Sequence, residues 1–407
     1  MNILGMIPRP RFLAVFLVLM PVVAIVDGLA MAPLTLALVT LLAWQHRQAL
    51  ADWRGILRSG SSGIVIVALL AVWPVLTSLW SILPHASFVT SLRSGSFLLL
   101  ALFGELLAGR RDFKTDRELW SWPALGVFLA SLLVISWQMP DGGVLPRIAR
   151  LLYHDELQYL TKDINRGLCV LSVLVWPAVI GLSRSHHRKL ALFLPMLLLL
   201  VLFSLHSLSA KTGLFAGMVT LCAMMWRPAS CRRVLILGLP MLFMAWPLLF
   251  YLYEPMLREV VFDDLPGSSQ HRIEIWHFVL EKWQERPWLG WGVDSSRVIP
   301  GGLEEISPGL VRLPLHPHNL PLHVLLEQGL VGFGLFFMAL NLFVRRVMQL
   351  GESRDPMVAA AMAATLTSYL TIAMSGFGMW QAWWESTGLA AFLIAAFASQ
   401  YHHKEAP

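Results

Sequence analysis

The hydrophobic residues of this chain fall into long runs that are separated by mostly short polar segments. A helix of roughly 17–25 predominantly apolar residues crosses the hydrocarbon core of a bilayer, and twelve runs reach or approach that length. They cover approximately residues 12–26, 29–44, 64–81, 89–108, 122–138, 167–182, 190–208, 212–226, 234–252, 321–344, 357–378 and 385–400. The pattern therefore predicts an all-α polytopic membrane protein with about twelve transmembrane helices.

The longest polar segment, residues 253–320, has a helical pattern of its own. Between residues 269 and 285 the apolar residues fall on one stripe at helical spacing, which predicts an amphipathic helix. Ser268 or Ser269 is expected to cap this helix, and Pro287 is expected to end it. The segment is therefore expected to form a large loop that lies over the membrane surface.

The polar segments divide the chain into three parts. Residues 1–252 are expected to hold nine transmembrane helices and a shorter loop at 139–166, in which residues 145–160 are a second amphipathic candidate. Residues 253–320 are expected to form the large loop with its amphipathic helices, and residues 321–407 the last three transmembrane helices.

Composition and charge narrow the class of protein and its orientation. The chain is 57% hydrophobic and 14% charged, whereas soluble domains are about 25% charged. The net charge of +6 does not indicate nucleic acid, because the basic residues are scattered over short loops. Most of them lie in alternate loops, as the positive-inside rule expects. With those loops in the cytoplasm, both termini are cytoplasmic and residues 139–166 and 253–320 face outward.

The first apolar run has two interpretations. Arg9 and Arg11 precede it, and Ala30-Met31-Ala32 resembles the small-residue site at which signal peptides are cleaved. A second apolar run follows at once, so an uncleaved helix that pairs with the second as a hairpin is the expected structure.

The cysteines and histidines do not predict a metal site. The three cysteines lie in or beside apolar runs without metal-ligand spacing, so neither a zinc site nor a disulfide framework is expected. Three histidines are close in sequence, His316, His318 and His323. However, His318 and His323 are expected to point to different faces of a helix, and no carboxylate is spaced to join them. No metal and no cofactor are expected.

Tryptophans cluster near the predicted outer ends of the helices. They are Trp288, Trp291, Trp380, Trp383 and Trp384. Tryptophan favours the membrane–water interface, so these side chains are expected in the outer aromatic belt.

The chemistry-bearing stretch runs from Leu315 to Gly332, where a histidine-containing loop enters an apolar helix. Asn319 is suited to cap this helix and Pro321 to its first turn. His318 then lies near the positive end of the helix dipole. A neutral imidazole there can take a proton while the helix end attracts an anion, which suits a reaction that activates a hydroxyl and expels a phosphate. Otherwise His318 is an ordinary loop histidine.

Two patterns in this region resemble a known family. The first is His318-Asn319 followed by Leu322, Glu327, Gly329 and Gly332. The second is Arg272-x-x-x-Trp276 followed by Pro287-x-x-Gly290-x-Gly292. Both are similar to motifs of the O-antigen ligase and polymerase superfamily. Its members are bacterial inner-membrane enzymes that move glycans from a polyprenyl pyrophosphate carrier to an acceptor. The resemblance implies a GT-C-like membrane glycosyltransferase in which Arg272 binds the carrier's phosphates.

A third match is partial. Ser207-Leu-Ser-Ala-Lys211-Thr-Gly213 lies at a predicted outer boundary, where the family usually has a Ser-Arg pair. Here Ala210-Lys211 replaces that pair, so the charge is kept and the bidentate fork of arginine is lost. Asn165-Arg166-Gly167 resembles another family element more weakly.

Basic residues outside the cytoplasmic loops need a separate explanation. They include Arg93, Arg147, Arg150, Arg166 and Lys211. A cation in or beside hydrocarbon is costly and often marks a site, so these residues are candidates to bind a lipid-linked pyrophosphate. For Arg147 and Arg150, contact with lipid headgroups explains the charge equally well.

Together these features favour an O-antigen ligase of the bacterial inner membrane. It would transfer a glycan from undecaprenyl pyrophosphate to lipid A core oligosaccharide on the periplasmic side, with inversion and without a metal. His318 is the expected base, and Arg272 and Lys211 are expected to stabilise the leaving pyrophosphate. The expected substrate-binding residues are Arg93, Arg147, Arg150, Arg166, Asn319, Trp276 and Glu327.

Alternatives remain open at this point. Glu327 could instead pair with a buried cation. An O-antigen polymerase or a protein O-oligosaccharyltransferase of the same superfamily would use a different acceptor. A transporter of lipid-linked or anionic solute is a different class, but the chain shows no matching halves with interrupted helices. Apart from these substrates and membrane lipids no partner is expected.

Overall fold

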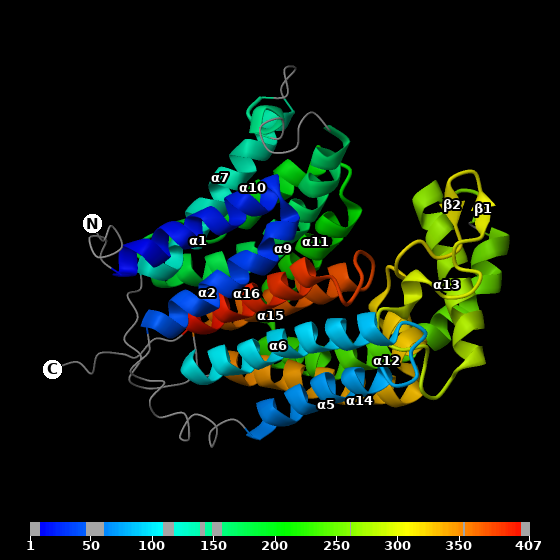
Figure 1. The fold of residues 1–407 in the computed structure, drawn as a ribbon. Coiled ribbons are helices and arrows are strands. Elements are labelled where there is room, and N and C mark those ends of the chain that lie inside the picture. The colour runs from blue at the N-terminus through cyan, green and yellow to red at the C-terminus, as the bar shows by residue number, and fades with distance from the viewer. Residues whose placement is uncertain are drawn as a thin grey trace, which may run out of the picture.

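The computed structural model describes residues 9–45, 61–108, 118–138, 143–148, 157–260, 262–352 and 355–399. Over these residues the regular structure is helical apart from one small hairpin (Figure 1). The long helices are α1 (Arg9–Val26), α2 (Met31–Gln45), α5 (Ser61–Thr77), α6 (Pro84–Ala108), α7 (Trp122–Trp137), α9 (Leu157–Arg184), α10 (Phe193–Phe203), α11 (Leu208–Trp226), α12 (Pro228–Val260), α13 (Gly267–Glu285), α14 (Leu320–Glu352), α15 (Pro356–Ala373) and α16 (Ala382–Ser399). The hairpin pairs β1 (Glu305–Ser307) with β2 (Leu310–Val311) in antiparallel orientation.

Each of the twelve predicted apolar runs overlaps one of these helices, and α13 lies in the long polar segment. Within the described part of the chain, seven helices are long and apolar enough to cross a membrane, and three shorter helices are also apolar. The chain is therefore an all-α protein with several candidate membrane spans. The total of twelve spans and the side of the membrane that each loop faces stay predictions.

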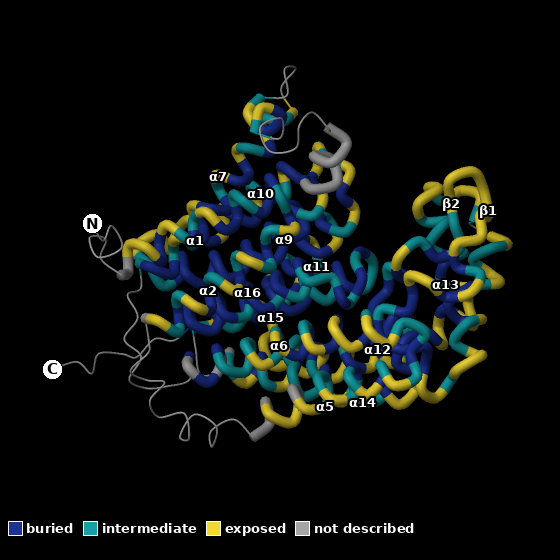
Figure 2. The backbone as a smooth tube through the Cα atoms, in the orientation of Figure 1, coloured by how far each residue is buried: buried dark blue, intermediate teal, exposed yellow. Residues whose placement is uncertain are grey.

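Helix α9 lies in the middle of the helical bundle, and 94% of the apolar stretch within Ile164–Arg184 is buried. It packs against α1, α7, α11, α15 and α16, and the buried residues concentrate around it in Figure 2. Trp176 of α9 donates a hydrogen bond to Ser368 Oγ of α15 at 2.7 Å. Ser368 Oγ in turn donates to the Gly213 carbonyl of α11 at 2.7 Å. Through Ser368 these two bonds link α9, α15 and α11 within the bundle.

Residues 262–319 form a lobe beyond the ends of the bundle helices, here called the α13 lobe (Figure 1). Helix α13 packs on α12 and α14. Its predicted apolar stripe is confirmed, because Ile273, Val279 and Leu280 are buried and Trp276 is partly buried. The predicted serine cap is wrong: the helix begins at Gly267, directly after Pro266, and no side chain caps it.

Helix α14 is broken at Gly329, where the backbone leaves the helical region with φ 62° and ψ −170°. The turn after Pro287 fills the break. Its N–H groups at Trp291 and Gly292 donate to the carbonyls of Leu326 and Glu327, at 3.1 and 2.8 Å. A Cβ at Gly290 would lie 2.5 Å from the Glu327 carbonyl carbon. The spaced glycines therefore allow the α13 lobe to reach the backbone of α14.

Two further expectations need correction or stay open. Trp291, Trp380, Trp383 and Trp384 are buried inside the protein, with 2–5% of their surface exposed, so their assignment to the aromatic belt is wrong. Trp288, at 66% exposed, is the exception. Of the amphipathic candidate at 145–160, residues 145–148 form a helical turn, and residues 149–156 lie outside the described ranges.

Candidate functional site

The loop ahead of α14 carries the histidine and asparagine that the sequence indicates. Asn319 is 1% exposed, and its Oδ1 accepts a hydrogen bond from the Leu322 N–H at 3.1 Å. The predicted N-cap is therefore confirmed. The Asn319 amide also donates to the Met374 carbonyl at 3.3 Å, which ties this loop to the end of α15. Because the side-chain oxygen and the side-chain NH₂ group of Asn319 are both hydrogen-bonded, Asn319 fixes the loop that carries His318.

His318 is held in the neutral form that accepts a proton through Nε2. Its Nδ1 lies 2.6 Å from the Gly376 carbonyl oxygen, so Nδ1 carries the proton and donates it. A neutral imidazole has one N–H, which leaves a lone pair on Nε2. Burial lowers the pKa of His318 below the ordinary value of 6.5. The Gly376 bond raises the pKa in part, and the positive charge of Arg272 lowers it. The ring is therefore neutral at pH 7.

Helix α13 supports the His318 loop with its aromatic face. Trp276 donates from Nε1 to the Pro317 carbonyl at 2.8 Å. Its ring is fixed edge-on against Phe250 and Trp246, with centroids 5.3 and 6.0 Å apart. Trp276 therefore positions the residue directly before His318.

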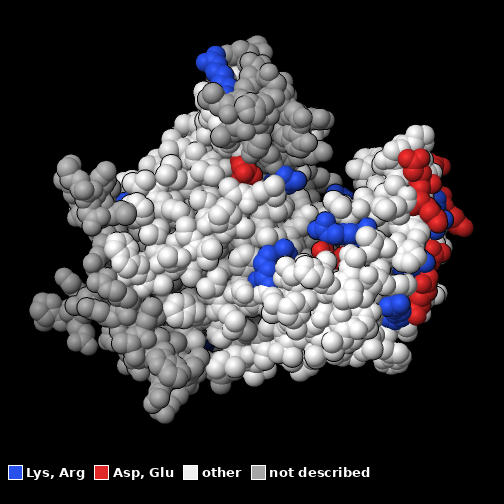
Figure 3. Space-filling view, in the orientation of Figure 1, with Lys and Arg blue, Asp and Glu red and all other residues white. Residues whose placement is uncertain are grey.

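Arg272 lies one helical turn before Trp276 on the same side of α13. Burial lowers the pKa of Arg272, which means that its charge is partly removed from water. Within the described ranges no acidic side chain pairs with it, unlike Arg258, which pairs with Glu274 at 2.6 Å. In Figure 3 several Lys and Arg residues lie where the bundle meets the α13 lobe, and most Asp and Glu residues line the far edge of the lobe. Arg272 is thus an uncompensated cation beside His318.

Three imidazoles gather at this point. The ring centroids of His316 and His318 are 4.2 Å apart, and those of His316 and His323 are 6.2 Å apart. Burial lowers the pKa of His316 to about 2, with further contributions from neighbouring positive charge. His323 is 3% exposed and accepts from the Met379 N–H at 3.1 Å through Nδ1. Among the side chains that the structure describes, no group of three or more is arranged to hold a metal ion.

Lys211 and Arg93, two other basic residues that were predicted to bind substrate, differ in their contacts with the protein. Lys211 lies in the first turn of α11. In that turn Ser209 Oγ lies 3.4 Å from the position of a Cβ at Gly376, so the start of α11 lies beside the segment that orients His318. Arg93 of α6 donates to the Trp380 carbonyl and lies 3.9 Å from Glu385. Arg93 is therefore already engaged with the protein, whereas no acidic side chain within the described ranges pairs with Lys211.

The remaining arginines belong to another region or are not described. Arg166 packs against Gly28 in the turn between α1 and α2. Arg147 is exposed in the short helical turn at residues 145–148, and Arg150 lies outside the described residues. Their proposed contact with substrate stays a prediction.

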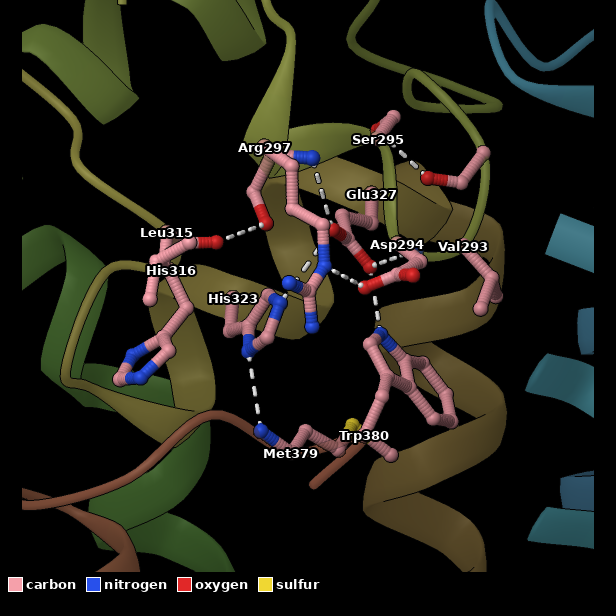
Figure 4. Close-up of polar contacts among 12 residues, drawn as sticks. Val293, Asp294, Ser295, Arg297, Leu315, His316, His323, Glu327, Met379 and Trp380 are labelled. Atoms are coloured by element: carbon pink, nitrogen blue, oxygen red, sulfur yellow. Dashed lines mark hydrogen bonds and ion pairs between the residues drawn. The ribbon is translucent and has the colours of Figure 1, made fainter. Parts of the chain in front are cut away.

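Glu327 is fully buried and sits between three segments of the chain (Figure 4). Its carboxylate accepts hydrogen bonds from the N–H groups of Asp294 and Ser296, at 2.8 and 3.0 Å. It also accepts from Trp380 Nε1 at 2.5 Å. Its Oε1 also lies 3.3 Å from Nε2 of buried His323, and the pairing of Glu327 with a buried cation stays a prediction.

Sequence reasoning missed two residues of the site, Gly376 and Trp380. Both lie in the segment 374–381 between α15 and α16. The sequence Gly376-Phe-Gly378 was a usable signal, because closely spaced glycines indicate a special backbone path. The tryptophans beside it were instead assigned to the lipid interface.

Fold and site together define a multi-pass α-helical membrane protein with a neutral histidine, His318, beside Arg272, for which the described part of the chain offers no acidic partner, at one end of the bundle. The family model described as O-antigen ligase matches residues 169–337, which contain His318, Arg272 and Lys211. Over these residues the chain is therefore similar to the O-antigen ligase family.

Individual proteins show the same similarity. A Rickettsia conorii protein with the name "Putative polysaccharide ligase" is 26% identical over 334 residues, or 81% of this chain and 78% of that protein. A Rickettsia felis protein with the same description is 28% identical over 331 residues, covering 80% and 78%. An O-antigen ligase of Pseudomonas aeruginosa is 28% identical over 258 residues, covering 60% of this chain and 61% of that protein.

Proposed function

We propose that this protein transfers a glycan from undecaprenyl pyrophosphate to a hydroxyl of lipid A core oligosaccharide, at the periplasmic face of the bacterial inner membrane. One observation carries the proposal: His318, with a lone pair on Nε2, and Arg272, which has no acidic partner among the described residues, lie together where the bundle meets the α13 lobe. Similarity to known proteins supports it, because relatives bear the names polysaccharide ligase and O-antigen ligase.

The reaction is a single displacement at the anomeric carbon of the donor. The acceptor hydroxyl oxygen forms the new bond while the bond from the anomeric carbon to the pyrophosphate oxygen breaks. His318 Nε2 takes the hydroxyl proton. Proton transfer to a positioned base typically increases the rate by roughly 10²–10⁴-fold. Undecaprenyl pyrophosphate leaves with the electron pair, and attack opposite the leaving group inverts the anomeric centre.

Arg272 and Lys211 act on the leaving group in this proposal. Pyrophosphate carries negative charge well, and fixed cations in a partly desolvated place stabilise it strongly. A guanidinium fork can bind two phosphate oxygens at once, which suits Arg272. Because these cations neutralise the leaving group, the proposed reaction is metal-independent. Arg93, through its engagement with Trp380 and Glu385, is assigned a secondary role at the edge of the site.

Reconstituted transfer tests the function directly. Purified protein in lipid nanodiscs, supplied with undecaprenyl-pyrophosphate-linked glycan and lipid A core, is expected to form the joined product without ATP or an ion gradient. A nanodisc has no second compartment, so a transporter has nothing to accumulate there. Product formation in nanodiscs supports the transferase, and its absence with intact donor and acceptor would contradict it.

Thiol labelling tests the proposed orientation. Cysteines introduced as Ser307→Cys in β1 and His186→Cys beyond α9 lie at exposed positions. The first is expected to react in intact spheroplasts with a reagent that does not cross membranes. The second is expected to react only after the membrane is opened. The parent protein, with its own cysteines, sets the background, and the opposite labelling pattern would place the site in the cytoplasm.

A further inference from the structure

The carboxylate of Glu327 is used entirely within the protein. It is fully buried, and both of its oxygens accept hydrogen bonds. Oε1 accepts from the Ser296 N–H, and Oε2 accepts from the Asp294 N–H and from Trp380 Nε1 (Figure 4). A buried acid with this many donors fixes the segments that supply them. The geometry therefore argues against direct contact with substrate.

A second contact joins α14 to the same segment of chain. His323 lies one helical turn before Glu327, and its Nδ1 accepts from the Met379 N–H at 3.1 Å. Its Nε2 lies 3.3 Å from Glu327 Oε1. Two successive residues of segment 374–381, Met379 and Trp380, are thus attached to α14.

Segment 374–381 is also the part of the chain that orients His318. Its Gly376 carbonyl accepts from His318 Nδ1 at 2.6 Å. Gly376 lies four residues before Trp380. The position of the Gly376 carbonyl therefore depends on the hydrogen bond that anchors Trp380 to Glu327. Glu327 is therefore connected to the ring of His318 through its hydrogen bond with Trp380, the backbone from Trp380 to Gly376, and the hydrogen bond between Gly376 and His318.

We propose that Glu327 is a positioning residue: by holding Trp380 it places the Gly376 carbonyl that orients the His318 ring. This inference rests on the proposed function, in which His318 is the base. It replaces the expectation that Glu327 binds substrate. Groups that orient metal-bound histidines through the second ring nitrogen typically affect activity by about 10–100-fold, and we expect an effect of this size for the ring of His318.

The parent enzyme sets the reference for a pH test. A base works only when unprotonated, so the rate is expected to fall as the pH drops through the pKa of His318, which lies below 6.5. The charged or titratable groups around His318 are His316 in its own loop, His271 and Arg272 on α13, and His323 on α14. The Gly376 bond raises the pKa of His318. Loss of that bond therefore moves the acidic limb of the rate profile to lower pH.

Two variants interrupt the path at different points. Glu327→Gln places an amide NH₂ against groups that are themselves donors, and Trp380→Phe keeps a ring but removes the indole N–H. Each is expected to lower kcat by about 10–100-fold, to leave KM for the lipid-linked donor unchanged, and to shift the acidic limb to lower pH. The double variant is expected to be no slower than the slower single variant, because both act through one contact.

Trp383→Phe is the matched control, since Trp383 is equally buried but packs by ring contacts with Phe377 and Trp384. All variants are measured as purified full-length protein in nanodiscs. A raised donor KM in Glu327→Gln would make Glu327 a substrate ligand, and an unshifted pH limb or additive losses would make it a structural residue only. Either result overturns this inference. Parent-level activity in His318→Ala would instead overturn the proposed function, so the two failures are distinguishable.

Discussion

His318→Ala is expected to reduce glycan transfer by roughly 10²–10⁴-fold, the contribution of a positioned general base. The Gly376 bond leaves Nε2 of His318 free to take a proton, and alanine removes that nitrogen. The measurement is the rate of product formation by purified protein from a lipid-linked donor and lipid A core. Protein yield and donor binding are expected to stay at the parent level, because the His318 side chain is outside the core of the bundle.

Three other histidines test whether the effect belongs to His318. His277→Ala is the surface control, because the exposed imidazole of His277 lies 3.3 Å from each of the carboxylates of Glu254 and Glu281, away from the His318 loop. His316 is a poor base, since burial lowers its pKa to about 2, and His323 is already engaged with Met379. Both alanine variants are expected to be milder than His318→Ala. Full activity in His318→Ala would remove this residue from the mechanism.

Arg272→Ala is expected to cost roughly 10²–10³-fold in transfer, the size of effect seen when one group that stabilises developing charge is removed. Arg272 carries a partly desolvated charge without an acidic partner in the described ranges, so a phosphate is a suitable counterion. Binding of the donor is expected to weaken, and binding of the acceptor to stay unchanged. Arg312→Ala is the matched control, because Arg312 pairs with Glu304 on the surface of the same lobe.

Exchange of the two basic residue types separates charge from geometry. Lys211→Arg is expected to keep much of the activity and Lys211→Ala to lose most of it, if Lys211 acts as a charge near the leaving group. Arg272→Lys is expected to be tolerated less well than Lys211→Arg, because lysine cannot form the bidentate contact. Parent-level transfer in Lys211→Ala would make Lys211 an interfacial anchor. The phosphate site would then be sought among Arg93 and the other predicted cations.

Local patterns were sufficient for several features of the fold and site. The apolar runs predicted the long helices, because each run is a local stretch whose period and length already exclude most other structures. The cap at Asn319 was predictable for the same reason, since a cap involves residues three positions apart. The stripe on α13 was confirmed, but the cap of that helix was not. The motif around His318 led to the family whose model matches residues 169–337.

Contacts between distant segments could not be derived from these patterns. The glycines after Pro287 look like an ordinary turn in the sequence, yet they meet a break in α14 about forty residues later in the chain. Trp380 is indistinguishable from an interfacial tryptophan until its N–H is seen to meet Glu327. Burial of a side chain depends on which helices surround it, and the hydrophobic pattern of a single helix does not identify those neighbouring helices.

The sequence by itself determined that this is a helical membrane protein similar to the O-antigen ligase family, with His318 and Arg272 as its candidate reactive residues. Hydrophobic period, helix capping and motif spacing are properties of neighbouring residues, so they can be read along the chain. Only the tertiary structure decided which tautomer His318 adopts and that Glu327 holds the segment behind it. Those features depend on hydrogen bonds between segments more than fifty residues apart, and folding alone brings their donors and acceptors together.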